Sequence, residues 1–154
     1  MEKLITREEV VRLAFASNPS IAPSAIPETA IVTAQEKFVR PVVGRLYERI
    51  GGGELPALLD EYIKPALAFY VKLLVLPVVA SPVGQTGVVK YRSSGFAPAS
   101  ERELSRLERK TRSNALMLMR IAVAHIESNR QLYPEYEPSE NVLNRISTDG
   151  GIVL

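Results

Sequence analysis

The sequence predicts a mainly α-helical bundle of about four to five helices, and three observations lead to this fold class. Apolar residues recur at three- and four-residue intervals through most of the chain, two stretches open with capping boxes, and prolines and glycines mark where helices end. The length of 154 residues and the 46% hydrophobic content fit one folded domain. We place this helical domain at residues 1–137 and expect residues 138–154 to form a flexible or extended C-terminal tail.

Hydroxyl and proline residues bound the first two predicted helices. Thr6 is followed three positions later by Glu9, an arrangement typical of a capping box that starts a helix. That helix should end before Asn18-Pro19, because the residue that precedes a proline avoids helical backbone angles. The next helix begins with Pro27 in its first turn, where no amide partner is lost.

Pro41 interrupts this second helix. The apolar pattern continues past it to Ile50, so Pro41 predicts a kink or a break near Arg40. Gly51-Gly52-Gly53 then ends the segment. We interpret this triplet as a plain loop between helices, because a phosphate-binding loop would follow a strand and precede Gly-Lys-Ser/Thr.

The central predicted helix is the most apolar part of the chain. Its apolar pattern begins at Leu55 and surrounds the whole helix over Ala66–Ala80, while Pro65 predicts a bend. The apolar run is about 15 residues long, shorter than the roughly 20 that span a bilayer, and it contains Lys72 and Pro77. We therefore expect a buried helix and no membrane association.

Residues 81–99 look least helical, because prolines and glycines surround a short apolar stretch. We expect a loop or short β-hairpin that projects as an arm, with Val88, Val89 and Tyr91 as candidate interface residues.

After this arm, Ser100 begins a second capping box and the longest helix, which runs to about Asn129. The expected buried stripe of this helix is Leu104, Leu107, Thr111, Ala115, Leu118, Ala122, His125 and Ile126.

Two tyrosines follow the long helix, and their role has two interpretations. Tyr133 and Tyr136 flank a proline, where they would serve either as aromatic anchors in an interface or as the closure of the helix end.

Composition narrows the possible chemistry. The chain has no cysteine and a single histidine, which excludes disulfides, thiolate metal sites, cysteine nucleophiles and a two-histidine metal motif. His125 lies on the apolar side of its helix, so a satisfied core or interface histidine is favoured over a catalytic base. We expect no enzymatic activity, no cofactor and no metal.

The N-terminus lacks the apolar core of a signal peptide, which predicts an intracellular protein.

Basic residues gather on the first half of the long helix. Arg102, Arg106, Arg109, Lys110 and Arg112 alternate there with glutamates. One interpretation is a solvated face with intrahelical ion pairs, and the other is a contact strip for an acidic partner subunit or for DNA. The formal net charge of +2 is small for a dedicated nucleic-acid-binding protein, although it does not decide between the two.

Two proline-containing runs resemble a known family. The run from Phe38 to Tyr47 and the run from Leu58 to Tyr70 are similar to parts of the head-tail connector, or adaptor, proteins of tailed phages and prophages. The order of parts continues this resemblance through Gln85–Val89, Pro98–Ser100 and Asn129 to Tyr133–Tyr136. It extends over roughly residues 4–137.

The resemblance implies a structural role without catalysis. Proteins of this family form a ring between the portal and the tail, where they line or support the channel that DNA traverses. The implied partners are other copies of the chain, the portal protein, stopper or tail-completion proteins, and DNA that passes without sequence-specific binding. The implied location is the host cytoplasm during assembly and then the virion neck. Ring stoichiometry, and the choice between adaptor, stopper and tail-completion roles, stay open. The alternative is a helical DNA-binding packaging or regulatory protein that uses the basic strip.

Overall fold

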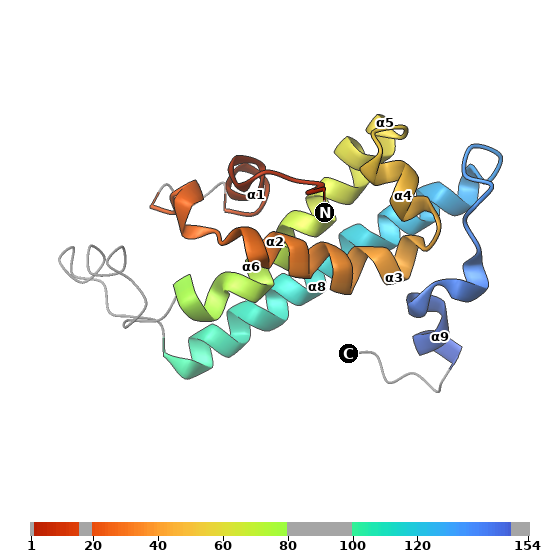
Figure 1. Ribbon diagram of the computed structural model, residues 1–154. Helices are drawn as coiled ribbons and strands as arrows, with labels where there is room; N and C mark the ends of the chain where they lie inside the picture. Colours follow the sequence, from red (N-terminus) through yellow and green to blue (C-terminus); the bar gives the residue numbers. More distant parts are fainter. Residues whose placement is uncertain (1, 16–19, 80–99, 149–154) are drawn as a thin grey trace.

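The computed structural model describes residues 2–15, 20–79 and 100–148, which form a bundle of helices around one core (Figure 1). Over these ranges the chain has six helices and no strand, so the predicted all-α class is confirmed. The predicted arm at 81–99, with Val88, Val89 and Tyr91, lies outside the described residues.

The N-terminal helix starts as predicted. In α1 (Arg7–Ala14), Thr6 Oγ1 accepts from the Glu9 amide at 3.2 Å and the Glu9 carboxylate accepts from the Thr6 amide at 2.9 Å. A 3₁₀ turn and α2 (Glu28–Ala34) follow, and Pro27 lies just before the first turn of α2 rather than within it. The extended backbone of Pro27 lets its carbonyl accept from the Ala30 amide at 3.0 Å.

A π-helical turn over Gln35–Val39 carries the chain past Pro41. The amide of Arg40 donates to the carbonyl of Gln35, five residues back, and α3 (Arg40–Val43) continues the same helix. The wider turn gives the proline ring room, so the helix does not break near Arg40. It ends instead at Gly44, whose φ of 58° is a conformation that glycine adopts without strain.

The second interrupting proline is accommodated in the same way. After α4 (Leu46–Gly51), a continuous helix runs through α5 (Pro56–Leu58), a π turn over Leu59–Ile63 and α6 (Lys64–Val79). Pro65 again occupies the second position after the π turn, where Lys64 donates its amide to the Leu59 carbonyl. The irregularity predicted at Pro65 therefore takes the form of a π turn, which ends two residues before this proline.

Helix α6 is the centre of the core. It packs against α8 (Glu101–Ser128) on one side and against α1 and α2 elsewhere (Figure 1). Residues Pro56–Val79 are long and apolar enough to cross a membrane by length and composition, yet half of their most apolar window is buried within the fold. The packing assigns α6 to the core, as expected for a buried helix.

Helix α8 begins with the predicted capping box at Ser100 and ends at Asn129. Its buried residues are Thr111, Ala115, Met119, Ala122, Val123 and Ile126. The predicted stripe is wrong at its start, because Leu107 is 37% exposed and Leu104 is only half-buried. Leu118 and His125 are likewise half-buried, while Met119 takes the core position.

The segment after residue 137 is helical, so the prediction of an extended or flexible tail is wrong for residues 138–148. A 3₁₀ turn over Pro138–Glu140 leads into α9 (Val142–Thr148). Asn141 is buried at 1% exposure, and Arg45 pairs with Glu140 at 3.3 Å. These contacts hold the segment against the domain. Residues 149–154 lie outside the described part.

Candidate functional site

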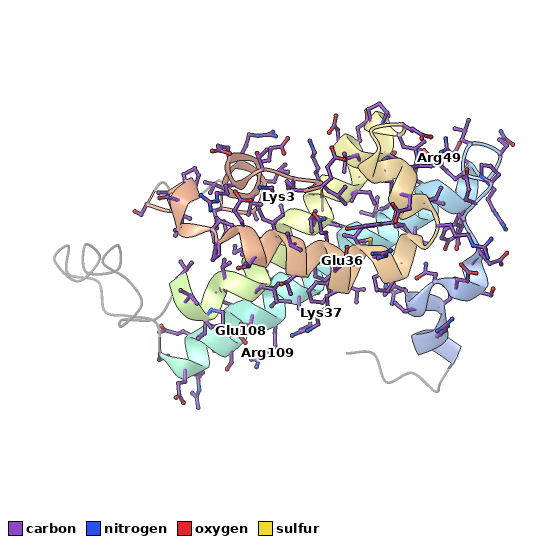
Figure 2. All side chains as sticks on the ribbon, in the orientation of Figure 1. Lys3, Glu36, Lys37, Arg49, Glu108 and Arg109 are labelled. Atoms are coloured by element: carbon purple, nitrogen blue, oxygen red, sulfur yellow. The ribbon has the colours of Figure 1, made fainter. Side chains whose placement is uncertain are left out.

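The predicted basic strip lies on the surface of α8. Arg102, Arg106, Arg109, Lys110 and Arg112 are all exposed. At 100° per residue, Arg102, Arg106 and Lys110 project away from the buried side, and Arg109 lies at its flank. Arg112 lies nearer the core, where its charge affects the Tyr70 hydroxyl. Figure 2 labels Glu108 and Arg109 on this half of the helix.

These five cations have no acidic partner within the described residues. No ion pair at 4.0 Å or less involves any of them. Glu103, the nearest candidate by spacing, accepts from the amide of Ser100 in the capping box. The intrahelical ion pairs of the first interpretation are therefore not formed, and the charges remain available to a partner.

An apolar ridge continues the same face toward the C-terminus of α8. Met117 is 62% exposed and Ile121 is 49% exposed, and the exposed Ala124 completes the row. The helical angle places these three residues in line with Arg106 and Lys110. We call Arg102, Arg106, Arg109, Lys110, Met117, Ile121 and Ala124 the outer face of α8.

Sequence reasoning missed the apolar half of this outer face. The expected pattern for this helix is one apolar stripe, and Met117 and Ile121 fall on the side opposite that stripe. The signal is nevertheless present as an i, i+4 apolar pair outside the stripe. Exposed apolar side chains that adjoin charged residues are typical of surfaces that bind a partner.

The two tyrosines close the end of α8 and are not exposed anchors. Tyr133 and Tyr136 are 5% and 2% exposed. The Tyr136 hydroxyl donates to Glu127 at 2.9 Å and accepts from Asn141 Nδ2 at 2.9 Å. Of the two interpretations, closure of the helix end is the one these contacts favour, because hydrogen bonds within the chain satisfy both hydroxyls.

His125 is a satisfied structural histidine, as predicted. Its ring stacks on Tyr62 at 4.1 Å between centroids, and Nε2 lies 2.9 Å from the Tyr133 hydroxyl. Asn129 Nδ2 approaches Nδ1 at 3.4 Å. Burial, with smaller contributions from Tyr62 and Glu61, raises the pKa of Tyr133, so this hydroxyl stays protonated near neutral pH.

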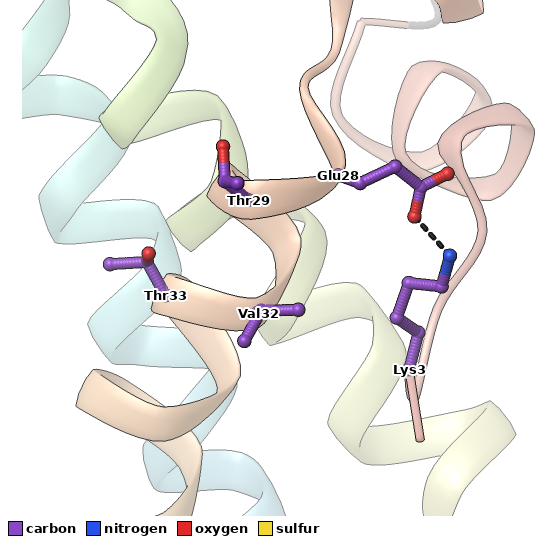
Figure 3. A pocket seen from close by; sticks show the side chains of 5 residues that line it. All are labelled: Lys3, Glu28, Thr29, Val32 and Thr33. Carbon is purple, nitrogen blue, oxygen red and sulfur yellow. Dashed lines mark hydrogen bonds and ion pairs between the residues drawn. The ribbon is translucent and has the colours of Figure 1, made fainter. Parts of the chain in front are cut away.

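A surface hollow of about 350 Å³ lies beside α2 (Figure 3). Lys3 and Glu28 face each other across it and form an ion pair, and Thr29, Val32 and Thr33 complete its wall. The charged groups of this hollow neutralise each other, which leaves little for a ligand to recognise. Over the described ranges, no three potential metal ligands among His, Asp and Glu come together.

Comparison with known proteins gives a family and no activity. The sequence profile of a family of unknown function (DUF6712) matches residues 27–146, which include the outer face of α8. No curated protein matches the chain, and no solved structure does.

Proposed function

We propose that this chain, which belongs to the DUF6712 family of unknown function, is a structural subunit of a tailed-phage or prophage neck. In this role it forms a ring adaptor between the portal and the tail. The ring lines or supports the DNA channel and performs no catalysis.

One observation carries this proposal: the outer face of α8 joins cations that form no ion pair within the described ranges to exposed apolar side chains on one helix. Met117 and Ile121 supply apolar contact at the centre of such an interface. Arg102, Arg106 and Arg109 then add charge that orients an acidic partner surface. The resemblance in the proline-containing runs directs the choice among binding proteins toward a neck component.

Assembly follows from the geometry of such a surface. A ring uses contacts in which one face of a subunit meets a different face of its neighbour. The outer face of α8 would serve as one of these faces, with its apolar ridge in the centre of the contact and its cations at the rim. Because the net charge is only +2, a ring of these subunits would not hold passing DNA strongly.

A second candidate is a helical DNA-binding packaging or regulatory protein. The absence of ion pairs at Arg102, Arg106, Arg109, Lys110 and Arg112 among the described residues favours it, because such cations on one helix suit phosphate contacts. In that case the isolated protein would bind duplex DNA with a steep dependence on salt. Neutralising each cation that touches a phosphate would reduce the slope of log affinity against log salt concentration by about 1.

The mass of the purified protein, measured by light scattering across concentration, tests the proposal. We expect either a ring or a monomer that joins the portal protein of the same genome in fixed stoichiometry. A monomer or dimer that ignores the portal and binds duplex DNA with a steep salt slope would overturn the neck role and support the second candidate.

A further inference from the structure

A second pocket, of about 310 Å³, lies where the end of α1, the middle of α6 and the first half of α8 meet. Leu13, Phe69 and Leu107 form its apolar wall. Its polar wall consists of two lysines, Lys72 and Lys110, together with Thr111 and Asn114. Pockets of this size hold small organic ligands, and convergent polar groups on one side determine which ligand fits.

Lys72 is fixed in position at this pocket. Its Nζ donates to the carbonyl of Ala14, the last residue of α1, at 3.1 Å. The rings of Phe15 and Phe69 lie 5.1 and 5.8 Å from the same atom, within cation–π range. An ammonium group has three N–H donors, so the Ala14 contact leaves further donor capacity for a ligand in the pocket that Lys72 lines.

The positive charge of the pocket has no counterion within the described residues. Neither Lys72 nor Lys110 forms an ion pair there. Segments 16–19 and 80–99, which adjoin α1 and α6 in sequence, contain no aspartate or glutamate. Burial, and then the charge of Lys110, lower the pKa of Lys72, because two cations lie near each other without an anion.

We propose that this pocket binds a phosphate group. Lys72 and Lys110 would neutralise its charge, which is close to −2 for a monoester at neutral pH. Thr111 and Asn114 would supply hydroxyl and amide hydrogen bonds, so that donors from separate side chains surround a tetrahedral anion. Leu13 and Phe69 would contact the organic part of the ligand. A carboxylate fits this wall less well, because it is planar and carries a single charge.

The phosphate has two possible sources. One is a free phosphate ester, and the other is the backbone of DNA lying along the outer face of α8, because Lys110 belongs to both that face and the pocket. The inference goes beyond the neck role and does not depend on it: assembly with the portal and phosphate binding are measured separately.

Calorimetric titration of the full chain with phenyl phosphate tests the site. Benzoate has the same ring with a carboxylate and serves as the ligand control, at matched ionic strength. We expect saturable binding of one phenyl phosphate per chain. Binding should weaken at least about tenfold in Lys72→Met and in Lys110→Met. Lys110→Met is the cleaner variant, because Lys110 is exposed and forms no ion pair within the part of the chain that the structure describes, whereas Lys72 also caps α1.

Lys37→Met is the matched control, since Lys37 is exposed on another helical segment and lies over the Phe38 ring at 5.4 Å. It should bind phenyl phosphate as the parent does. Competition between phenyl phosphate and a short DNA duplex for the parent chain, kept in Lys37→Met, would identify the DNA backbone as the source. Binding of phenyl phosphate without such competition would identify a free ester. Absence of saturable binding, equal affinity for benzoate, or equal losses in Lys110→Met and Lys37→Met would each overturn the proposal.

Discussion

The two halves of α8 differ in almost every respect, although they belong to one uninterrupted helix. Five of its six buried residues lie between Ala115 and Ile126. There the helix end is closed by Tyr133 and Tyr136 through hydrogen bonds of 2.9 Å. Over Glu101–Lys110 no side chain is buried, and the arginines are unpaired among the described residues.

Charges elsewhere in the fold strengthen this contrast. Arg49 pairs with Glu135 at 2.9 Å and with Glu54 at 3.0 Å, and Lys64 pairs with both Glu9 and Asp60 at 2.8 Å. Two of these pairs, those with Glu135 and Glu9, connect segments that are distant in sequence. The C-terminal half of α8 therefore stabilises the domain through its inner side, whereas the first half contributes little to the core and leaves its cations without an ion pair among the described residues.

Truncation of an apolar side chain to alanine should give the largest difference in stability between the two halves of α8. Met119→Ala in the buried half should lower the free energy of unfolding by about 2–5 kcal/mol, because it leaves a cavity at a fully buried site. Leu107→Ala in the exposed half should lower it by no more than about 1 kcal/mol, because this side chain is 37% exposed. Urea unfolding of both variants checks this, and equal losses would contradict the division of the helix.

The tyrosine closure should have the next largest effect. Tyr136→Phe removes the hydroxyl that joins Glu127 to the buried Asn141. We expect a loss of about 1–3 kcal/mol, because the Asn141 amide loses its partner in a buried site. Thermal or urea unfolding measures the loss. A variant as stable as the parent would show that water replaces the hydroxyl and that the closure contributes little.

The ion pairs that Lys64 forms with Glu9 and Asp60 should make stability depend on pH, with a smaller effect than the two changes above. Burial acts to raise the pKa of Glu9, but hydrogen bonds from Lys64 and Thr6 outweigh it and lower this pKa below 4.5. Burial likewise opposes the charge of Lys64, whose pKa is nevertheless raised above 10.5 by Asp60 and Glu9. The Glu9 contribution is therefore present above pH 4.5 and is lost as the pH falls through the folded-state pKa. The Lys64 contribution is present below pH 10.5 and is lost as the pH rises through its raised pKa.

Glu9→Gln should therefore reduce stability by about 1 kcal/mol at pH 7 and have less effect at about pH 3. Urea unfolding of parent and variant at the two pH values makes the comparison. An equal difference at both values would assign the loss to packing rather than to charge.

Neutralising the exposed strip should have the smallest effect on stability. The triple change Arg102→Gln, Arg106→Gln and Arg109→Gln should alter the free energy of unfolding by less than about 0.5 kcal/mol, because these side chains make no ion pair among the described residues. Arg49→Gln is the matched control and should lower stability more than the triple change does, because it removes two carboxylate pairs. A triple variant less stable than Arg49→Gln would show that the strip serves the fold.

Local signals predict much of the fold. The capping boxes at Thr6 and Ser100 locate the starts of α1 and α8, since both their partners lie within four residues. The π turns before Pro41 and Pro65 are not predictable in the same way. A proline indicates that a regular turn fails there, but several backbone solutions relieve the clash.

Long-range contacts limit what can be predicted of the site. The basic strip is visible because charge can be read from sequence, whereas its lack of partners depends on where the glutamates of other helices lie. Sequence alone does not decide between two roles for Tyr133 and Tyr136, because their hydroxyl partners, His125 and Glu127, become neighbours only after the chain folds back. The contact that fixes the C-terminal segment from a distance is the pair between Arg45 and Glu140, which the sequence does not place together.

The most direct test of the outer face of α8 as a docking surface is assembly with the portal protein after a single substitution there. Ile121→Glu places a charge on the apolar ridge, and Thr33→Glu places the same charge at an exposed position on α2, which packs on α6. Light scattering should show that Thr33→Glu forms the parent complex, while Ile121→Glu stays unassembled with an unchanged urea midpoint. A complex of parent mass formed by Ile121→Glu would contradict the assignment of this face.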